Sequence, residues 1–552
     1  MCHPKRLLRK VRWVASGLVN IITVQDGGRQ AVNRPSLFEC CMVFPTSQMA
    51  SEMSGSQFSM SEAQLRNIAQ YNKSMNRNNG GCVMRGDILH KLKEIVGDEH
   101  ATDDIAICAS YSRDQHWHFV PPKRPSIVVR PAEKEEVRRV LMLANAEKVP
   151  VVPLSTGINI RGLAIPVHDG SILLDLGRMN RIEINEDMKT ATVEPGVTFG
   201  MLYEKTRKFN LRPSFPDAPL TVGVLTNYYL RGIYQTSAAD GHDHVLSYEM
   251  ILPNGEIIRT GSRALSEMPY FRYGVGPDFT GVLCSHPGTC GVVVELTARL
   301  YRIYENKKAY FIGFDRLDDA LPLIYNAMND NLVTSLRLVD NQSWLKGICG
   351  TYDYDYNLLP KFVMCVLIED VKEIFDAKNR IFGKYISASG GKLLELPEEF
   401  AQNFFYESLG GTEKSCMVFG LRGNYHCIGI YGPMNLAPRY YEVHRRTAVE
   451  VGFPEDFVHF YLNPIYPFHG QLCYIELDIF YDGAEENAGE KLREYNRKMF
   501  DRLLETGIYG WFRPYAGIIE PTVERIGYLA DIWRGLLKIL DPNGIMNPGK
   551  LF

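Results

Sequence analysis

The segment Val151–Ile182 constrains this chain more than any other stretch, because an apolar run leads into a loop and a second apolar run leaves it. Both runs are predicted to be strands, the second over Ser171–Leu176. The loop between them contains Gly157, Asn159 and Gly162. Glycine, and to a lesser degree asparagine, adopts positive φ, so successive backbone N–H groups can converge on an anion. The segment predicts a phosphate-binding loop, with a surface hairpin as the alternative.

Composition and charge exclude several classes of protein. The 552 residues are enough for two or three domains, and 45% hydrophobic with 23% charged residues is typical of a soluble globular chain. A net charge of −3 gives no sign of nucleic-acid binding or of a polybasic membrane surface. Twelve cysteines without CxxC pairs argue against a disulfide scaffold or a structural metal site. No segment is long and apolar enough to span a membrane. A cytoplasmic location is the resulting prediction.

The amino-terminal part differs from the rest. Residues 1–60 are predicted to be a poorly structured extension; their basic opening and interrupted apolar run make a weak secretory signal, and translation could begin at Met53 or Met60. From residue 61 to about residue 110 the pattern is helical, with an apolar stripe that ends at Gly97. The stripe consists of Leu89, Leu92, Ile95 and Val96.

Further along, the pattern predicts a β-α-β unit. A strand at Ile127–Val129 is followed by a helix from Pro131, and a strand returns at Val149. The predicted buried face of the helix consists of Val137, Val140, Leu141 and Ala144. A hairpin is predicted around Pro253–Glu256. An antiparallel sheet with helices on one side is predicted for residues 306–504.

Three runs together carry a family resemblance: LDLGRMNRI after the loop, the glycine-punctuated stretch from Arg272 to Tyr301, and the terminal IMNPGKLF. The chain resembles the FAD-linked flavoproteins of the vanillyl-alcohol oxidase and p-cresol methylhydroxylase family. The resemblance implies an α+β, two-domain FAD-binding fold of the p-cresol methylhydroxylase type, with an α/β cap domain over the flavin. It implies that residues 61–305 are the FAD-binding domain with a helical entry segment, 306–504 the cap or substrate domain, and 505–552 a return to the FAD domain.

The same resemblance implies which residues contact FAD. It allows a covalent link to the flavin through His426, with Tyr425 and His459 as alternatives. The implied cofactor-binding residues are Ser155, Thr156, Gly157, Ile158, Asn159, Ile160, Gly162, Pro216, Gly288, Gly291, Val292, His426, Asn547 and Lys550.

On the substrate side, the resemblance implies that Asp217 and Arg513 are catalytic. Asp217 would lie near flavin N5, although an Asp after Pro is otherwise a turn former. Arg513 would bind a planar anion bidentately, although it could be a surface arginine. The two phenol-binding tyrosines of the family fall at Ile160 and Phe512, so both hydroxyls are missing. Weaker candidates for the pocket are Tyr509, Tyr515, His242, His244 and His469.

We therefore expect an FAD-dependent oxidoreductase that oxidises a phenolic, benzylic or other anionic alcohol-type substrate by hydride transfer to flavin N5. One alternative is an FAD-dependent D-2-hydroxyacid dehydrogenase of the lactate or glycolate type, but its HxGDGNxH-like metal cluster is missing from the sequence, so no metal is predicted. Another alternative is a flavin-binding protein without turnover. The electron acceptor would be O₂, a cytochrome or an iron–sulfur protein, and the implied assembly is a homodimer.

Overall fold

The computed structural model describes residues 82–114, 120–158, 162–216, 218–229, 241–274, 276–284, 286–349, 353–409, 423–465, 470–485, 487–506 and 525–551. The chain divides into two compact units, Met1–Lys91 and Leu92–Phe552. The predicted extension, residues 1–60, lies outside the described residues. Helix α4, Cys82–Val96, ends before Gly97, whose φ is 91°. Leu92 and Val96, which belong to the second unit, are buried as predicted.

A four-stranded sheet of order β1-β2-β4-β3 opens the second unit. Helix α6, Lys134–Glu147, buries the predicted face of Val137, Val140, Leu141 and Ala144, but it begins three residues after Pro131. Strands β3 and β4 are parallel, which excludes the hairpin alternative for the loop that joins them. The strands are β1 (Ala101–Thr102), β2 (Ile127–Val129), β3 (Val151–Leu154) and β4 (Ile172–Asp175).

A second, five-stranded sheet has the order β5-β6-β10-β8-β9 and consists of antiparallel pairs. The predicted hairpin joins β8 to β9, and Gly255 supplies its positive φ of 87°. Helix α16, Tyr528–Leu540, packs Trp533, Leu536 and Leu537 against the core of this sheet. The strands and helices are β5 (Ile182–Asn185), β6 (Thr190–Val193), α7 (Phe199–Thr206), β8 (Val245–Ile251), β9 (Ile257–Arg259), α8 (Phe279–Val282) and β10 (Val292–Arg299), with the small pair β7 (Leu211–Arg212) and β11 (Tyr301–Arg302).

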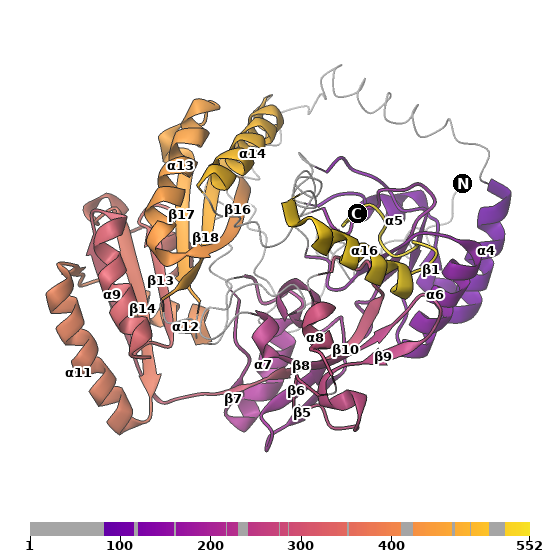
Figure 1. The fold of residues 1–552 in the computed structure, drawn as a ribbon, viewed down its shortest axis with the longest axis horizontal. Helices are drawn as coiled ribbons and strands as arrows, with labels where there is room; N and C mark the ends of the chain where they lie inside the picture. The colour runs from indigo at the N-terminus through magenta and orange to yellow at the C-terminus, as the bar shows by residue number, and fades with distance from the viewer. Residues whose placement is uncertain are drawn as a thin grey trace, which may run out of the picture. The chain divides into compact units, whose positions relative to one another are not determined.

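The third large sheet has seven strands in the order β15-β12-β14-β13-β17-β18-β16, and all of its pairs are antiparallel, as predicted (Figure 1). Helices α9, α11, α13 and α14 pack on one face, which we call the outer face. The strands are β12 (Asn306–Phe314), β13 (Ser335–Asp340), β14 (Phe362–Asp370), β15 (Lys392–Leu393), β16 (Asn424–Pro433), β17 (Val458–Pro464) and β18 (Leu472–Tyr481).

The expectation of helices on one side only is wrong. Two shorter helices contribute Trp344 and Phe404 to a second hydrophobic cluster on the opposite face, which we call the inner face. Strand alternation produces this division, since Met364 and Val366 belong to the outer cluster whereas Cys365 and Leu367 belong to the inner one. The helices are α9 (Leu317–Asn329), α10 (Trp344–Ile348), α11 (Lys372–Ser389), α12 (Glu398–Leu409), α13 (Ala437–Glu450) and α14 (Ala488–Glu505).

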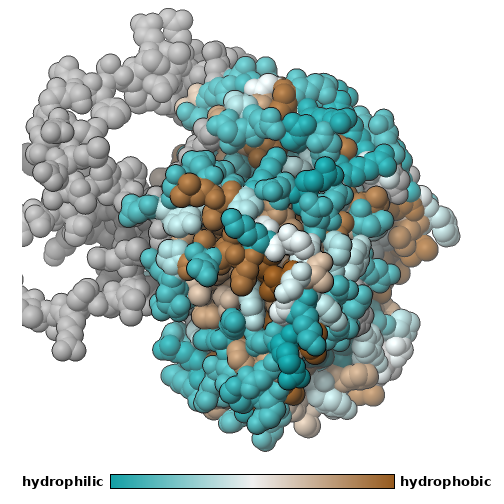
Figure 2. All heavy atoms as spheres, turned by 90° about the vertical axis from the view of Figure 1, so that its left-hand side faces the viewer, coloured by the Kyte–Doolittle hydropathy of each residue, from teal (hydrophilic) through white to brown (hydrophobic). Residues whose placement is uncertain are grey.

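Hydrophilic residues predominate on the side of the molecule shown in Figure 2, and hydrophobic residues lie in small areas between them. Among the described helices, none combines the length and apolar character that crossing a bilayer requires. Within the described ranges, seven buried cysteines are free thiols.

Candidate functional site

The loop after β3 packs against a π-helix, η4 (Val224–Tyr229). The Ser155 hydroxyl hydrogen-bonds the Thr226 hydroxyl. A Cβ at Gly223 would lie 3.1 Å from the Thr156 side chain, so a glycine there lets the loop lie close to η4. The Thr156 hydroxyl is buried and makes no hydrogen bond to any described residue. A buried hydroxyl without a partner is costly, and a bound ligand could satisfy it.

Two glycines shape this loop, and their roles differ. Gly157 has a φ of 84°, and a Cβ there would meet nothing within 4 Å, so the backbone faces open space. Gly162 has a φ of 69°, and a Cβ there would lie 2.3 Å from Val120. The Gly162 N–H donates to the Asp114 carboxylate at 2.6 Å. Ile158 is exposed on the loop. Asn159 and Ile160 lie outside the described residues.

The carboxyl-terminal segment returns to this loop. Asn547 donates its side-chain N–H groups to the carbonyl oxygens of Leu163, at 2.9 Å, and Pro287, at 2.6 Å. Its Oδ1 is buried and has no partner among the described residues. A Cβ at Gly288 would lie 2.5 Å from the Pro153 ring, so a glycine is needed where these segments converge. Three distant segments thus form one wall around the loop.

Lys550 adds a cation to the same wall. Its ammonium donates to the Gly162 carbonyl oxygen at 2.7 Å, and the side chain is buried. Burial lowers the pKa of Lys550 to about 8, while the charge of Asp114 acts to raise it. A buried amine of this kind favours an anion that would keep it charged. The open Gly157, the unpartnered Thr156 hydroxyl and the buried Lys550 cation fit a diphosphate, because phosphate oxygens accept from groups of these kinds. The Asn547 Oδ1 is an acceptor, so it fits a hydroxyl or N–H group of a ligand.

The other predicted cofactor residues lie in the sheet framework. A Cβ at Gly291 would lie 2.6 Å from the Ile251 carbonyl oxygen, so this position needs a glycine. Val292 is the first residue of β10 and is buried in the core. Pro216 is buried. Asp217, between Pro216 and Ala218, is outside the described residues, as are Arg513, Tyr509, Tyr515, Phe512 and His469, and the side chain of His242.

His244, a weak pocket candidate, is a core residue. It is fully buried, its Nδ1 is 3.0 Å from the Tyr301 hydroxyl oxygen, and its ring stacks on Tyr229. These contacts occupy the ring from two sides. The ring is therefore part of the packing beneath the five-stranded sheet.

The inner face of the seven-stranded sheet carries a polar cluster that the sequence did not single out. Tyr425 and Tyr474 each donate a hydroxyl hydrogen bond to the Glu476 carboxylate at 2.8 Å. Asp478, two residues further along the same strand, accepts from the Trp344 indole N–H at 2.6 Å. Gly429 makes this possible, because a Cβ there would lie 2.3 Å from the Tyr474 hydroxyl.

A buried ion pair shows which part of the chain this face meets. Arg212, in β7, bonds Glu369, in β14, at 2.7 Å, and the two side chains are only 3% and 2% exposed. Glu369 follows Cys365 and Leu367 in the strand alternation, so it belongs to the inner face. Strand β7 therefore contacts the inner face of the seven-stranded sheet at the end of β14.

His426 lies on the opposite, outer face. Its Nε2 is 2.9 Å from Oδ1 of Asn496 in α14, and its ring meets Tyr495 edge-on. The structure does not bring His426 together with the inner-face cluster, because neighbouring residues of a strand point to opposite faces. Tyr425 and His459 both belong to the inner face, and His459 Nδ1 lies 3.2 Å from Asp340. Of the three residues considered for a flavin link, Tyr425 and His459 thus share the inner face and His426 does not.

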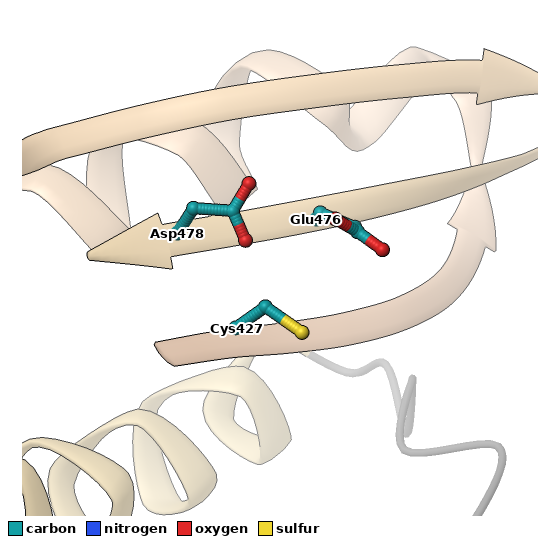
Figure 3. A group of neighbouring side chains, drawn as sticks. All are labelled: Cys427, Glu476 and Asp478. Atoms are coloured by element: carbon teal, nitrogen blue, oxygen red, sulfur yellow. The ribbon is translucent and has the colours of Figure 1, made fainter. Parts of the chain in front are cut away.

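Figure 3 shows Cys427, Glu476 and Asp478 together. One ligand atom from each lies within 4.8 Å of the others, and all three residues are buried. Such a set can hold a metal ion, or its two acids can share a proton. The signal for it was in the sequence YIELDIFYD, where two acids alternate with apolar residues; that pattern otherwise indicates a strand with one solvated face.

Comparisons with known proteins show that the chain is similar to FAD-binding proteins. Residues 125–261 match the family described as FAD binding domain. The chain is 25% identical over 477 residues to the glycolate oxidase subunit GlcD of Bacillus subtilis (strain 168), covering 84% of this chain and 97% of that protein. It is 30% identical over 201 residues, 35% of this chain, to the flavoprotein subunit of 4-cresol dehydrogenase (hydroxylating) of Pseudomonas putida, of which the match spans 39%. The crystal structure of p-cresol methylhydroxylase with substrate bound superimposes with a TM-score of 0.75 at 18% identity, covering 84% of this chain and 96% of that chain.

Proposed function

Because the chain is an FAD-dependent oxidoreductase with the fold of p-cresol methylhydroxylase, we propose that it oxidises a phenolic or benzylic alcohol. FAD, when bound, supplies the hydride acceptor, and the protein supplies binding, orientation and charge. Arg513 and Asp217 would orient the substrate, and both residues lie outside the described ranges.

The observation that carries the proposal is the inner-face cluster of Tyr425, Tyr474, Glu476 and Asp478. It offers hydroxyl and carboxylate oxygens, which hydrogen-bond an alcohol or phenol, next to aromatic packing from Tyr461. A hydroxyl group can both donate to such carboxylate oxygens and accept from such tyrosines. The cluster therefore supports an alcohol-type or phenolic substrate.

For the cofactor, we propose that Thr156 and Lys550 hold the FAD diphosphate: Thr156 has a buried hydroxyl without a partner among the described residues, and Lys550 is a buried cation. Both N–H groups of Asn547 are already donated, so its Oδ1 would accept from a hydroxyl or N–H group of the cofactor. Gly157 permits close approach of phosphate oxygens to the backbone. Ser155 and Ile158 would shape the loop around the diphosphate.

The alternative substrate class is a D-2-hydroxyacid. It is favoured by the match to a protein described as a glycolate oxidase subunit, which extends over nearly the whole of that protein. The two classes differ in what the pocket must neutralise, since a hydroxyacid brings a carboxylate that needs a cation beside it.

Anaerobic addition of phenols, benzylic alcohols and D-2-hydroxyacids to the flavin-loaded protein separates the two classes. Under our proposal the flavin band is bleached by a phenolic or benzylic alcohol and unaffected by D-lactate or glycolate. Bleaching by hydroxyacids alone would contradict it. Reoxidation of the bleached protein by O₂, by a cytochrome or by an iron–sulfur protein identifies the acceptor, and light scattering tests the proposed homodimer.

A further inference from the structure

Helix α16 carries two apolar stripes, which lie on different faces of the helix. The inner stripe lies towards the core of the five-stranded sheet and consists of Ala530, Trp533, Leu537 and Leu540. Its spacing of three and four residues is that of a single helix face. One such stripe is enough to attach a surface helix to its domain, so the second stripe of α16 has a different role.

The outer stripe is exposed. It consists of Tyr528, Ile532, Gly535 and Ile539, which follow one another at intervals of four, three and four residues. Tyr528 is 78% exposed, Ile532 is 58% exposed and Ile539 is 75% exposed, so no described residue covers these side chains. Exposed apolar side chains that form a continuous row, in contrast to single ones, are typical of a surface that binds another protein.

The outer stripe has the spacing of a helix that pairs with a second helix. Residues at alternating intervals of four and three lie along one seam, and side chains of the second helix pack between them. Gly535 lies near the middle of this seam, and a Cβ there would meet nothing within 4 Å. A glycine inside a helix is less favourable than an alanine. At this position it leaves room for a side chain of a second helix.

The flanks of the seam differ in character. Asp531 and Lys538, seven residues apart, lie on one flank, and Leu529 and Leu536, also seven residues apart, lie on the other. Asp531 bonds Arg534 of the same helix at 2.8 Å, whereas Lys538 has no ion-pair partner among the described residues. A helix that fits this seam therefore offers a cation opposite Asp531 and an anion opposite Lys538.

A second copy of α16 meets this requirement. When two identical helices pair about a two-fold axis perpendicular to them, they run antiparallel, and the same flank of each helix faces its copy. Asp531 then lies opposite Lys538 of the partner subunit, and symmetry repeats the pair. A parallel arrangement would instead place both charges against the flank that carries Leu529 and Leu536. Charge complementarity thus selects the antiparallel pair.

We propose that a second copy of this chain docks on the outer stripe of α16, so that two α16 helices pack antiparallel at the centre of a homodimer interface. Ile532 of each subunit packs over Gly535 of the partner subunit, and two ion pairs between Asp531 and Lys538 flank the contact. The same surface patch serves both subunits, so the interface closes and no further copies add. The proposal does not depend on which substrate the protein oxidises.

The first experiment measures the mass of the full chain, with FAD present, by sedimentation velocity and light scattering at increasing concentration. The wild type should be a dimer and Ile539→Glu a monomer, because the dimer would bury an unpaired carboxylate. Leu358→Glu is the matched control, since Leu358 is 77% exposed on another part of the chain, and it should remain a dimer. Both replaced side chains are exposed, so circular dichroism and the melting temperature should match the wild type. A wild type that is monomeric at every concentration, or a dimer that persists in Ile539→Glu, would overturn the proposal.

The second experiment tests the antiparallel arrangement by charge reversal. Asp531→Lys and Lys538→Asp each bring like charges together twice per dimer, so each should raise the dimer dissociation constant by about tenfold or more. The chain that carries both changes recreates the two ion pairs in reverse and should regain most of the affinity. Glu494→Lys, which reverses an acid paired with Arg497 on α14 at the same spacing, should leave the constant unchanged. Single variants that dimerise like the wild type, or a double variant weaker than both, would rule out the antiparallel pair.

Discussion

Asn547 and Pro287 lie 260 positions apart in the chain, yet the Asn547 side chain donates a 2.6 Å hydrogen bond to the Pro287 carbonyl oxygen. The second N–H of the same amide donates to Leu163, which leads out of the predicted phosphate loop. One side chain therefore connects the loop, the glycine-rich segment before β10 and the terminal segment. This connection is the basis for the first prediction.

Replacing Asn547 with Asp removes both donated hydrogen bonds and places a carboxylate against two carbonyl oxygens. We expect a loss of stability of about 2–5 kcal/mol, because two buried acceptors lose their donors and a charge is buried. We also expect weaker FAD binding. Denaturant unfolding of the apoprotein and calorimetric titration with FAD measure the two effects, and Asn543→Asp, which alters an exposed amide bonded to Asn145, is the matched control. Unchanged stability and FAD affinity would contradict the assigned role.

Lys550 predicts a pH dependence of FAD binding. Its pKa is lowered to about 8 in the ligand-free protein, and a diphosphate beside it would raise that value. Above about pH 8, FAD binding must then take up a proton, so affinity should fall as pH rises through this value. Lys550→Arg, which stays charged, should remove the dependence. The measurement is the dissociation constant of FAD from pH 7 to 10, and a flat profile in the wild type would rule out contact between Lys550 and the diphosphate.

The buried pair of Arg212 and Glu369 predicts a strong asymmetry between single and double substitutions. Glu369→Gln leaves the Arg212 charge buried beside Tyr301 and should cost about 3–5 kcal/mol. Replacing both residues together with apolar side chains of similar size should restore most of that loss, because no buried charge remains. Thermal and denaturant unfolding of the two variants test this, and a double variant less stable than Glu369→Gln would contradict it.

His444 predicts a loss of stability in acid. Burial lowers its pKa to about 3, although its bonds to the His459 and Asp478 carbonyl oxygens act to raise it. In the unfolded chain the pKa is near 6.5, so below that value the unfolded state binds more protons than the folded one. Unfolding free energy should therefore fall as pH drops from about 6.5 towards 3. The same series in His444→Gln should show a shallower decline; identical slopes would assign the acid sensitivity to other groups.

The sequence predicted the elements whose causes are local. The face of α6 follows from helical spacing alone, and the turn at Gly255 follows from turn chemistry. The loop after β3 was predicted from its glycines, and the terminal Asn547 and Lys550 were expected at the FAD site from the family resemblance. The structure places both beside that loop.

The inner-face cluster was missed for a physical reason. In the run around Glu476 and Asp478, alternation predicts one polar face and one apolar face, but it does not say whether water or protein covers the polar one. Here α10 and residues from other strands cover it, and nothing local in the sequence encodes that contact. The same limit applies to His426, because the strand pattern separates it from Tyr425 without saying which of the two faces the FAD-binding part.

The central claim is that this FAD-binding protein oxidises a phenolic or benzylic alcohol. Its most direct test is the visible spectrum of the purified protein, reconstituted with FAD if necessary, during anaerobic addition of phenols, benzylic alcohols and D-2-hydroxyacids. The account predicts a flavin spectrum that a phenolic or benzylic alcohol bleaches in a single turnover. A protein that binds no flavin after reconstitution, or a flavin that only D-2-hydroxyacids bleach, would contradict it.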